Sequence, residues 1–498
     1  DFLIMKITIV GGGTAGWLAA LMISKIQKDM HTVTIIDSSA IGIIGAGEAS
    51  TGYLRGIINN EIWDFGCNEF DFFKECKATP KLGILHKDWK SIGHEYLAPA
   101  DATVDDPAFG CNTLLSNYIA NEVPMHNSSV GGRLVSNKLT PFYTDNNQLV
   151  SIGRHSYNFD ARLAAKYLEK ICGTGVTKID AKVNDIILNN FGQVEKLVLD
   201  NNQTVLTDFV IDASGFSKLF SNKLNVKWQD YPELTLNAAL PFLMPEDKNT
   251  DFVATSWAQK HGWMFKIPKL DITGCGYAYD DRFITPDQAQ EEIEIVLGHK
   301  IEPIKNIKYN PGRLETVWNS NVLSIGLSAS FLEPLEATSI HATIVQLNKF
   351  IFTHLKETVD RTINKSSVKK YNTYMSQLFD DYKTFILVHY TTSRTDTEFW
   401  RNANLLAKNY DPVKEILNIS KDRLLNQSDL TPYYGYVQAE LYNYILCGLG
   451  HYTKETAVLE SNLLSRNKDA IREEARITKF LSQHNWLSNK EILDYIRR

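Results

Sequence analysis

Residues 6–16, KITIVGGGTAG, decide the fold class of this 498-residue chain. After Lys6, residues 7–10 are apolar or β-branched, so residues 6–10 predict a short buried strand, and residues 14–28 carry the apolar pattern of a helix. A second strand is expected over residues 32–36, and it ends at Asp37. Strand, glycine turn, helix, strand and acid in this order are typical of a βαβ unit that binds a dinucleotide.

The glycines of this turn form a G-x-G-x-x-G motif at Gly11, Gly13 and Gly16. The motif permits a tight turn and lets the backbone approach a pyrophosphate, whose charge is favoured by the helix N-terminus. Asp37 lies 21 residues beyond Gly16, where a carboxylate can accept hydrogen bonds from ribose hydroxyls. The motif predicts a dinucleotide cofactor, but it does not choose between FAD and NAD.

The spacing of apolar residues places further elements along the chain. Strands are expected over residues 183–188, 194–199, 205–211 and 322–326, and helices over residues 341–363, 367–388, 397–408 and 453–484. We therefore expect a mixed α/β protein, in which a Rossmann-like cofactor module is interrupted by a substrate module and followed by a helical part. The expected segments are 5–82 and 151–345 for the cofactor module, 83–150 for the substrate insertion, and 346–498 for the helical part covering the substrate site.

Composition excludes several classes of protein. The net charge of −6 argues against a nucleic-acid binder, because such proteins are strongly basic. No apolar run approaches the ~20 residues of a membrane span, and no signal peptide is recognisable. No compact His/Cys ligand cluster occurs, so no metal site is expected. Scattered cysteines without a C-x-x-C pair favour free thiols in a reducing, cytoplasmic compartment; they are Cys67, Cys76, Cys111, Cys172, Cys275 and Cys447.

Later motifs extend the pattern of the glycine turn. Residues 209–215, FVIDASG, and residues 322–327, VLSIGL, are strands that run into turns of small residues. Together with these, six runs in chain order resemble the flavin-dependent halogenases of the tryptophan halogenase family. They are GGGTAGW from residue 11, GAGEAS from 45, TPKLGI from 79, GWMFKIP from 262, SFLEPLEATSIH from 330 and HYTTSRTDTEFW from 389. The resemblance extends from Lys6 to about Trp400.

The resemblance implies a monooxygenase-like FAD-binding fold and a specific set of cofactor contacts. The positions expected to bind FAD are Gly11, Gly13, Thr14, Ala15, Gly16, Asp37, Gly47, Glu48, Ala49, Val183, Asp212, Gly215, Gly326, Leu327 and Ile340. The halide-binding pair falls on Thr338 and Ser339, where the family usually has Thr-Gly. The preferred halide therefore remains open among chloride, bromide and iodide. The cofactor enters as FADH2, with O2 and a halide ion as co-reactants. The chain has one dinucleotide motif, which implies a separate NAD(P)H-dependent flavin reductase as partner.

The family's catalytic lysine and glutamate fall on Lys81 and Glu336. The resemblance implies that hypohalous acid is made at the flavin, and this oxidant must then reach one position on the aromatic substrate. A lysine can hold it by a hydrogen bond or as a haloamine. A carboxylate can stabilise the cationic arene and accept its proton. Without the resemblance, Lys81 would be interpreted as a lysine on a solvated face. Glu336 would be interpreted as a carboxylate at the start of the helix near Thr338.

Departures from the family pattern concern the substrate. The W-x-W-x-I-P signature has Trp263 but Phe265 in place of the second tryptophan, so we expect a reshaped aromatic wall. The segment after Trp89 lacks the residues that help the tryptophan enzymes to hold free tryptophan. His94, in that segment, is either a substrate contact or a loop histidine without a role. Tyr433, Tyr434 and Tyr436 either line an aromatic pocket or pack in the core.

Three functions are therefore open: a two-component flavin halogenase acting on a small electron-rich aromatic, a flavin-dependent aromatic hydroxylase, and a non-catalytic FAD-binding protein. The presence of both Lys81 and Glu336 favours the first, because hydroxylation needs no lysine relay. The substrate, whether it is free or carrier-bound, and the formation of a homo-oligomer are not decided by the sequence.

Overall fold

The computed structural model describes residues 4–26, 30–42, 47–100, 113–246, 251–356, 363–430, 437–463 and 467–498. The chain forms two compact units, each made of three separate segments. Unit 1 comprises Asp1–Ala78, Phe159–Pro232 and Tyr309–Asp380, and unit 2 comprises Thr79–Asn158, Glu233–Lys308 and Asp381–Arg498. The expected mixed α/β class is confirmed.

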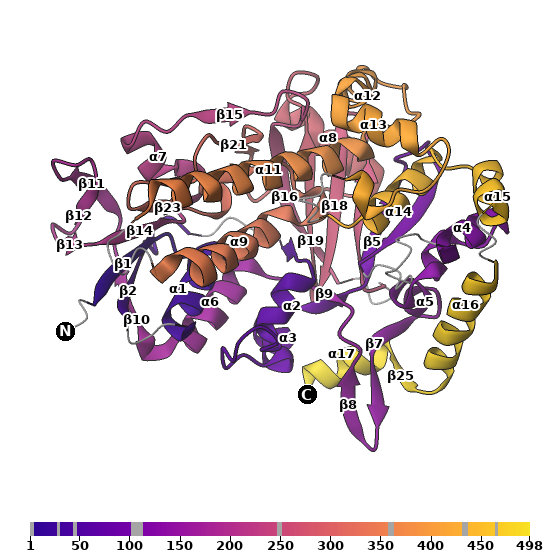
Figure 1. Cartoon of the computed structure of the whole chain (residues 1–498), viewed down its shortest axis with the longest axis horizontal. Helices are drawn as coiled ribbons and strands as arrows, with labels where there is room; N and C mark the ends of the chain where they lie inside the picture. The colour runs from indigo at the N-terminus through magenta and orange to yellow at the C-terminus, as the bar shows by residue number, and fades with distance from the viewer. Residues whose placement is uncertain are drawn as a thin grey trace. The chain divides into compact units, whose positions relative to one another are not determined.

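Unit 1 is built on a six-stranded sheet with the order β10-β2-β1-β14-β23-β22. Its strands are β1 (Met5–Val10), β2 (His31–Asp37), β10 (Val176–Asp180), β14 (Phe209–Asp212), β22 (Trp318–Asn319) and β23 (Val322–Ser324). All neighbours are parallel except β22 and β23. Figure 1 shows β1, β2 and β14 beside the helices of this unit. The predicted strand–turn–helix–strand unit is confirmed.

Three helices of unit 1 position the residues discussed below: α1 (Thr14–Ile26), α6 (Ala161–Cys172) and α9 (Thr338–Lys349). Helix α1 packs against both α6 and α9. It is almost completely buried along its length, which explains why its sequence is apolar on every face. The remaining helices of this unit are α2 (Gly52–Ile58), α3 (Glu69–Glu75), α7 (Leu219–Lys223) and the first part of α11 (Lys365–His389).

The single strand predicted over residues 205–211 is wrong, because two strands occupy this stretch. β13 (Thr204–Leu206) belongs to a three-stranded antiparallel sheet with β11 (Val183–Leu188) and β12 (Val194–Leu199), whereas β14 begins at Phe209. Asp208 separates them, since its Oδ2 accepts a 2.8 Å hydrogen bond from the backbone N–H of Lys6. The chain therefore changes sheets at the polar pair Thr207 and Asp208, between two apolar stretches.

Unit 2 contains a seven-stranded sheet with the order β20-β16-β19-β18-β17-β5-β6. Its strands are β5 (Gly83–Lys87), β6 (Glu95–Pro99), β16 (Ala238–Pro245), β17 (Val253–Ala258), β18 (Gly262–Lys269), β19 (Ile272–Tyr279) and β20 (Ile307–Lys308). Helix α8 (Pro286–Leu297) buries Ala289 and Ile293 in a core that includes Met264 and Tyr277. The helix begins at a capping box, in which Thr285 and Gln288 each bond the other's backbone.

Several further elements complete unit 2. They are β4 (Thr79–Lys81), α4 (Thr113–Ala120), α5 (Val130–Ser136), β7 (Leu139–Asp145), β8 (Gln148–Ser151), β9 (Ser156–Phe159), α12 (Glu398–Asn409), α13 (Asp411–Ile419), α14 (Ala439–Leu449), α15 (Lys454–Leu463), α16 (Asn467–Ser482), β25 (Asn485–Ser488) and α17 (Asn489–Arg497). Among the helices of the described ranges, none has the length and apolar character that crossing a bilayer requires.

The cysteines within the described ranges are free thiols. They are Cys67, Cys76, Cys172, Cys275 and Cys447, and Cys111 lies outside these ranges. Burial raises the pKa of the Cys67, Cys172 and Cys275 thiols to about 12, so these thiols are protonated and unreactive at neutral pH.

Candidate functional site

The glycine turn of unit 1 leaves one glycine facing open space. A Cβ on Gly11, whose φ is +115°, would lie 2.2 Å from the carbonyl oxygen of Ala213, and a Cβ on Gly16 would lie 1.8 Å from that of Gly11. A Cβ on Gly13 would have no atom within 4 Å. The outer glycines are therefore required by backbone packing, while the middle one borders the space in which a pyrophosphate can approach.

This difference predicts opposite outcomes for two alanine substitutions. Gly16→Ala is expected to unfold or strongly destabilise the protein, because its Cβ would overlap a backbone oxygen. Gly13→Ala is expected to keep the melting temperature of the wild type but to weaken FAD binding. Thermal unfolding and titration with FAD, followed by flavin fluorescence, measure the two effects. Unchanged FAD affinity of Gly13→Ala would show that the cofactor does not approach this side of the turn.

Asp37 lies against the same turn. A Cβ on Gly12 would fall 2.0 Å from the carboxyl carbon of Asp37, so the absence of a side chain at Gly12 makes room for the carboxylate. Burial raises the pKa of Asp37, although Lys178, whose Nζ is 3.8 Å from Oδ2, lowers it. The structure thus brings the predicted ribose-binding acid and the predicted pyrophosphate-binding turn together.

A second glycine segment meets the start of α1. Gly326, with φ +58°, begins the turn 326–328, and its Cβ would lie 2.9 Å from the Cβ of Ala15. Leu327 follows directly, and Ile340 is buried in the first turn of α9. The predicted positions at residues 15, 326, 327 and 340 therefore come from three separate elements of unit 1.

Three other predicted cofactor positions have different surroundings. Asp212 is fully buried and accepts hydrogen bonds from the backbone N–H of Ser214 at 3.0 Å and from the hydroxyl of Ser328 at 3.3 Å. Burial raises the pKa of Asp212. Gly215, with φ +68°, has open space on its Cβ side, whereas the side chain of Val183 lies in a hydrophobic core. Asp212 therefore binds the turns of its own unit.

Glu48 lies beside the helix that follows the glycine turn. The Thr14 hydroxyl donates to its Oε2 at 3.5 Å, and burial raises the pKa of Glu48 to about 7. Gly47 and Ala49 flank it, and residues 45 and 46 of the same motif lie outside the described ranges. The carboxyl group can therefore change its charge near neutral pH.

Helix α9 begins without a side-chain cap. Its N-cap residue, Ala337, has left-handed dihedral angles of φ 55° and ψ 32°, and it offers no side-chain oxygen. Thr338 is only 6% exposed, and its hydroxyl has no hydrogen-bond partner among the described residues. Ser339 follows, and Glu336 ends the preceding 3-10 turn and is half-buried. Unbonded N–H groups and the helix dipole at such a terminus attract an anion.

His341, in the first turn of α9, was not predicted as a site residue. Its Nδ1 lies 3.0 Å from the Thr51 hydroxyl, and the Tyr53 ring is 4.4 Å away between centroids. Burial lowers the pKa of His341 to about 4, so the ring is neutral at pH 7. Its position at the end of the SFLEPLEATSIH run was the available signal.

Lys81, in unit 2, is buried rather than solvated. It ends β4, pairs with Ser156 of β9, and exposes only 4% of its surface. The strand is anchored on both sides, since Ser156 donates to the Lys81 carbonyl at 3.4 Å and Thr79 donates to the Pro268 carbonyl at 2.6 Å. The alternative of a lysine on a solvated face is wrong, and a buried lysine is rare unless it is functional or paired.

Aromatic residues of unit 2 form a buried cluster. The Trp89 ring lies 6.3 Å from Trp263 and 5.5 Å from Trp400, and its Nε1 donates to the Ser256 carbonyl at 3.1 Å. Trp263 is buried, and its Nε1 has no hydrogen-bond partner among the described residues. Phe265 lies 6.1 Å from Trp263, and its ring occupies the space that a Cβ on residue 276 would need.

His94 lies in the tight turn between β5 and β6. Its backbone carbonyl accepts from the N–H of Asp88 at 2.7 Å, and its half-buried ring is 6.2 Å from that of Tyr96. Burial lowers the pKa of His94. The predicted residues Tyr433, Tyr434 and Tyr436 lie outside the described ranges.

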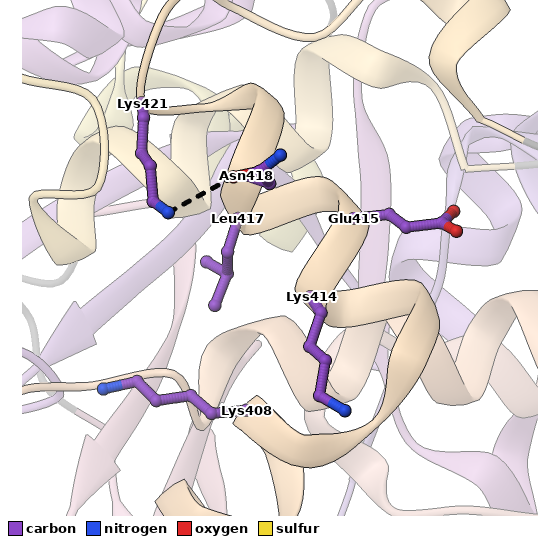
Figure 2. Close-up of a pocket in the computed structure, with 6 residues that line it drawn as sticks. All are labelled: Lys408, Lys414, Glu415, Leu417, Asn418 and Lys421. Atoms are coloured by element: carbon purple, nitrogen blue, oxygen red, sulfur yellow. Dashed lines mark hydrogen bonds between the residues drawn. The ribbon is translucent and has the colours of Figure 1, made fainter.

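A surface hollow of about 510 Å³ lies on helices α12 and α13 of unit 2 (Figure 2). It is lined by Lys408, Lys414, Glu415, Leu417, Asn418 and Lys421. The Lys421 ammonium donates to the Asn418 side chain at 3.3 Å, and Lys414 forms an ion pair with Asp411 at 2.8 Å. None of the predicted site residues lines this hollow, and its lysines already bind neighbouring groups.

A comparison with protein families identifies the family of this chain. The model of the tryptophan halogenase family matches residues 6–462. The chain belongs to this family. It is 28% identical to the tryptophan 7-halogenase RebH of Lentzea aerocolonigenes over 89% of each chain, and 27% identical to the tryptophan 6-halogenase ThaL of Streptomyces albogriseolus over 90% of each.

Solved structures agree with this membership. Tar14, described as a tryptophan C-6 flavin-dependent halogenase from taromycin biosynthesis, superposes with a TM-score of 0.87 at 25% identity. The alignment covers 99% of this chain and all of Tar14. The expected FAD-binding fold of the family therefore extends over the whole chain.

Proposed function

We propose that this family member is an FADH2-dependent halogenase of small electron-rich aromatics, supplied with FADH2 by a separate NAD(P)H-dependent flavin reductase. When bound, reduced flavin with O2 and a halide ion supplies hypohalous acid. The burial of Lys81 carries the proposal: its 4% exposure on an anchored strand is rare for a lysine unless it is functional or paired.

The residues of unit 1 suit a flavin. The open side of Gly13 and the carboxylate of Asp37 provide the pyrophosphate and ribose contacts, and the turn at Gly326 lies against Ala15. The backbone around Leu327 and Ile340 would face the isoalloxazine ring. Glu48, with its pKa raised to about 7, would place a carboxyl group near the cofactor that is partly protonated at neutral pH.

Lys81 and Glu336 have different roles in the electrophilic substitution of the aromatic ring. The Lys81 side chain holds the electrophilic halogen and directs it to one carbon of the arene. Addition of the halogen leaves a cationic ring, and the Glu336 carboxylate stabilises this charge and accepts the ring proton. Water exclusion around the buried lysine limits the loss of the oxidant to solvent.

The halide site is assigned to the start of α9. Thr338→Val removes the buried hydroxyl but keeps the side-chain volume, so the KM for halide is expected to rise about tenfold, the cost of one hydrogen bond to an anion. Thr343→Val on the same helix is the control, because the Thr343 hydroxyl already donates to the Ser339 carbonyl at 2.9 Å. If Thr338→Val has the same KM as the wild type for chloride, and also for bromide, then the halide binds elsewhere.

One assay tests the proposed reaction. The protein is incubated with a flavin reductase, NADH, FAD, a halide and either an indole or a phenol, and the products are analysed by mass spectrometry. Gain of a halogen supports the proposal. Gain of oxygen would identify a hydroxylase, and an unchanged substrate would identify a non-catalytic flavin-binding protein.

Neutral indoles, phenols or anilines are expected to be better substrates than free tryptophan, although the curated relatives above are named as tryptophan halogenases. The segment from Ser91 to Leu97 forms a tight turn and an edge strand, and Phe265 leaves more room beside Trp263 than an indole would. Bromide, and also iodide, should be accepted alongside chloride. Competition between tryptophan and indole at equal concentration, for each halide, measures the preference. A clear preference for tryptophan with chloride would show that other residues hold the zwitterion.

A further inference from the structure

The run from residue 389 to 400, HYTTSRTDTEFW, has no part in the chemistry proposed above, yet it contains buried polar groups. It links α11 to α12 in unit 2. Thr392 and Arg394 expose only 1% and 5% of their surfaces. A buried hydroxyl or guanidinium group is costly unless it has specific partners. Those partners lie in the turn between β5 and β6, at Trp89 and the residue before it.

Three consecutive side chains of this run bind three consecutive carbonyl groups of the turn. The donor–acceptor pairs are Arg394 to Asp88 at 3.2 Å, Thr392 to Trp89, and Ser393 to Lys90 at 2.6 Å. Carbonyl groups in a turn lack the partners that a regular ladder provides, so these donors satisfy them and fix the backbone. Thr392, Ser393 and Arg394 thus form a carbonyl clamp on the turn.

The guanidinium group of Arg394 is held in one orientation. Its Nε and Nη2 donate to the two carboxylate oxygens of Asp396 at 2.9 and 2.8 Å, and its central carbon lies 4.5 Å from the centre of the Trp400 ring. Trp400 is itself anchored, since its Nε1 donates to the Gln259 carbonyl at 2.7 Å. A two-pronged pair combined with stacking directs Nη1 to the turn, a geometry that a lysine cannot reproduce.

The turn is also held from its other side, at a residue with an unusual backbone. Asp88 has a φ of +60°, in the left-handed region that is unfavourable for most residues other than glycine. Its carboxylate accepts from the N–H of Gly93 and from Nε1 of Trp257, each at 2.6 Å. Such a conformation persists only where the surroundings determine it, and it is often found at functional sites. Asp88 is held by its carboxylate and, through Arg394, by its carbonyl.

Trp89, the central residue of the clamp, connects the turn to the aromatic cluster. Its ring is fully buried, and its Nε1 lies 3.0 Å from the Ser256 hydroxyl oxygen. The centre of the ring is 5.5 Å from that of Trp400 and 6.3 Å from that of Trp263, the predicted substrate-pocket residue. Movement of the turn would therefore displace the ring that supports Trp263.

We propose that Arg394 is a positioning residue for substrate recognition: through the turn at Trp89 it fixes the aromatic wall against which the arene binds. The clamp follows from the contacts above, whereas its effect on the substrate rests on the proposed function. A fixed wall is ready for the flat ring of the arene, and a mobile wall would have to be ordered when the arene binds, which weakens binding. Arg394 therefore acts on the binding of the arene and not on the formation of the oxidant.

The clamp is tested by hydrogen exchange, without any turnover. Arg394→Lys keeps a positive charge beside Asp396 but lacks the planar group that also reaches the turn. The N–H groups of Asp88, Gly93 and His94 are hydrogen-bonded within the turn. They are expected to exchange about tenfold faster than in the wild type, the scale of one lost hydrogen bond, while exchange in β16 and β19 is unchanged.

Arg282→Lys is the matched control in the same unit. Arg282 also forms a two-pronged pair with a carboxylate two residues away, that of Asp280. Its guanidinium group also lies over an aromatic ring, 5.6 Å from the centre of Phe283. These partners are its neighbours in sequence, so Arg282→Lys should leave the exchange of the turn at Trp89 unchanged.

A second measurement concerns the substrate. We expect Arg394→Lys to raise the KM for indole about tenfold, while kcat and the rate of flavin oxidation stay nearly unchanged, because only binding of the arene is weakened. A residue needed only for stability would lower the melting temperature and leave the KM of the folded enzyme unaltered. Ser393→Ala, at an exposed position, removes another bond of the clamp and should change exchange and KM in the same direction by less.

The outcomes separate the two proposals. Unchanged exchange of the turn in a folded Arg394→Lys overturns the clamp, and faster exchange with an unchanged KM for indole overturns its role in recognition. If Arg394→Lys does not fold, Ser393→Ala decides by the same two measurements. If the wild type halogenates no aromatic, the proposed function fails. Exchange of the turn, and the affinity of each variant for indole measured by calorimetry, then decide the role of Arg394.

Discussion

Lys81→Met is expected to abolish halogenation while FAD still binds and the reduced flavin is still oxidised by O2. Methionine retains the unbranched apolar stem of the lysine and is only one atom shorter, so the buried strand β4 should keep its packing. The loss is confined to the amine, which acts only after hypohalous acid has formed. Product yield by mass spectrometry, and flavin oxidation by absorbance, measure the two steps separately.

A lysine outside the buried site provides the matched control. Lys87 lies on the neighbouring strand β5, about one-third exposed, with its Nζ 3.9 Å from the Glu95 carboxylate. Lys87→Met should retain nearly the whole activity. Product from a folded Lys81→Met at more than a few per cent of the wild-type yield would refute the relay role of Lys81.

Glu336→Gln is expected to lower product formation roughly 10²–10³-fold, the scale for one lost electrostatic or proton-transfer group. Glutamine is isosteric, but it neither stabilises a cationic ring as strongly nor accepts its proton. Flavin binding and reduction should stay nearly unchanged. Rapid-quench measurement of the halogenation step, with a melting curve for each variant, gives the comparison.

Glu315→Gln is a suitable control, since Glu315 is an exposed carboxylate of the same unit. If Glu336→Gln lost its fold, the carboxylate would act mainly at the start of α9, next to the left-handed Ala337. If the folded variant kept its activity, another base would take the ring proton.

Local patterns predicted the cofactor module well. The strands β1 and β2 are short runs of apolar and β-branched residues bounded by the glycine turn and Asp37, so their type and limits were readable. The error at residues 205–211 arose because β13 and β14 are both apolar. Their separation depends on the contact of Asp208 with Lys6, 202 residues away, which no local pattern reports.

The residues of the candidate site were predictable only where they belong to a recognisable sequence motif. The glycine motif identified the turn, but it did not distinguish Gly13, which faces open space, from Gly16, which packs on backbone. Lys81 was named by resemblance alone, since its burial depends on strands distant in sequence. His341 was missed because the resemblance assigned no role to it, although it ends the SFLEPLEATSIH run.

The arrangement of each unit in three separate segments has a consequence for how the chain is made. During synthesis, all segments of unit 1 have emerged once Asp380 leaves the ribosome, whereas unit 2 still lacks Asp381–Arg498. At ~5–20 residues per second, this delay is on the order of ten seconds, far longer than helix or hairpin formation. The apolar strands of unit 2 therefore stay exposed until the rest of their core has been synthesised. Exposed apolar surface of this kind is bound by chaperones that hold unfolded chains. Low expression temperature and chaperone supply should determine its yield.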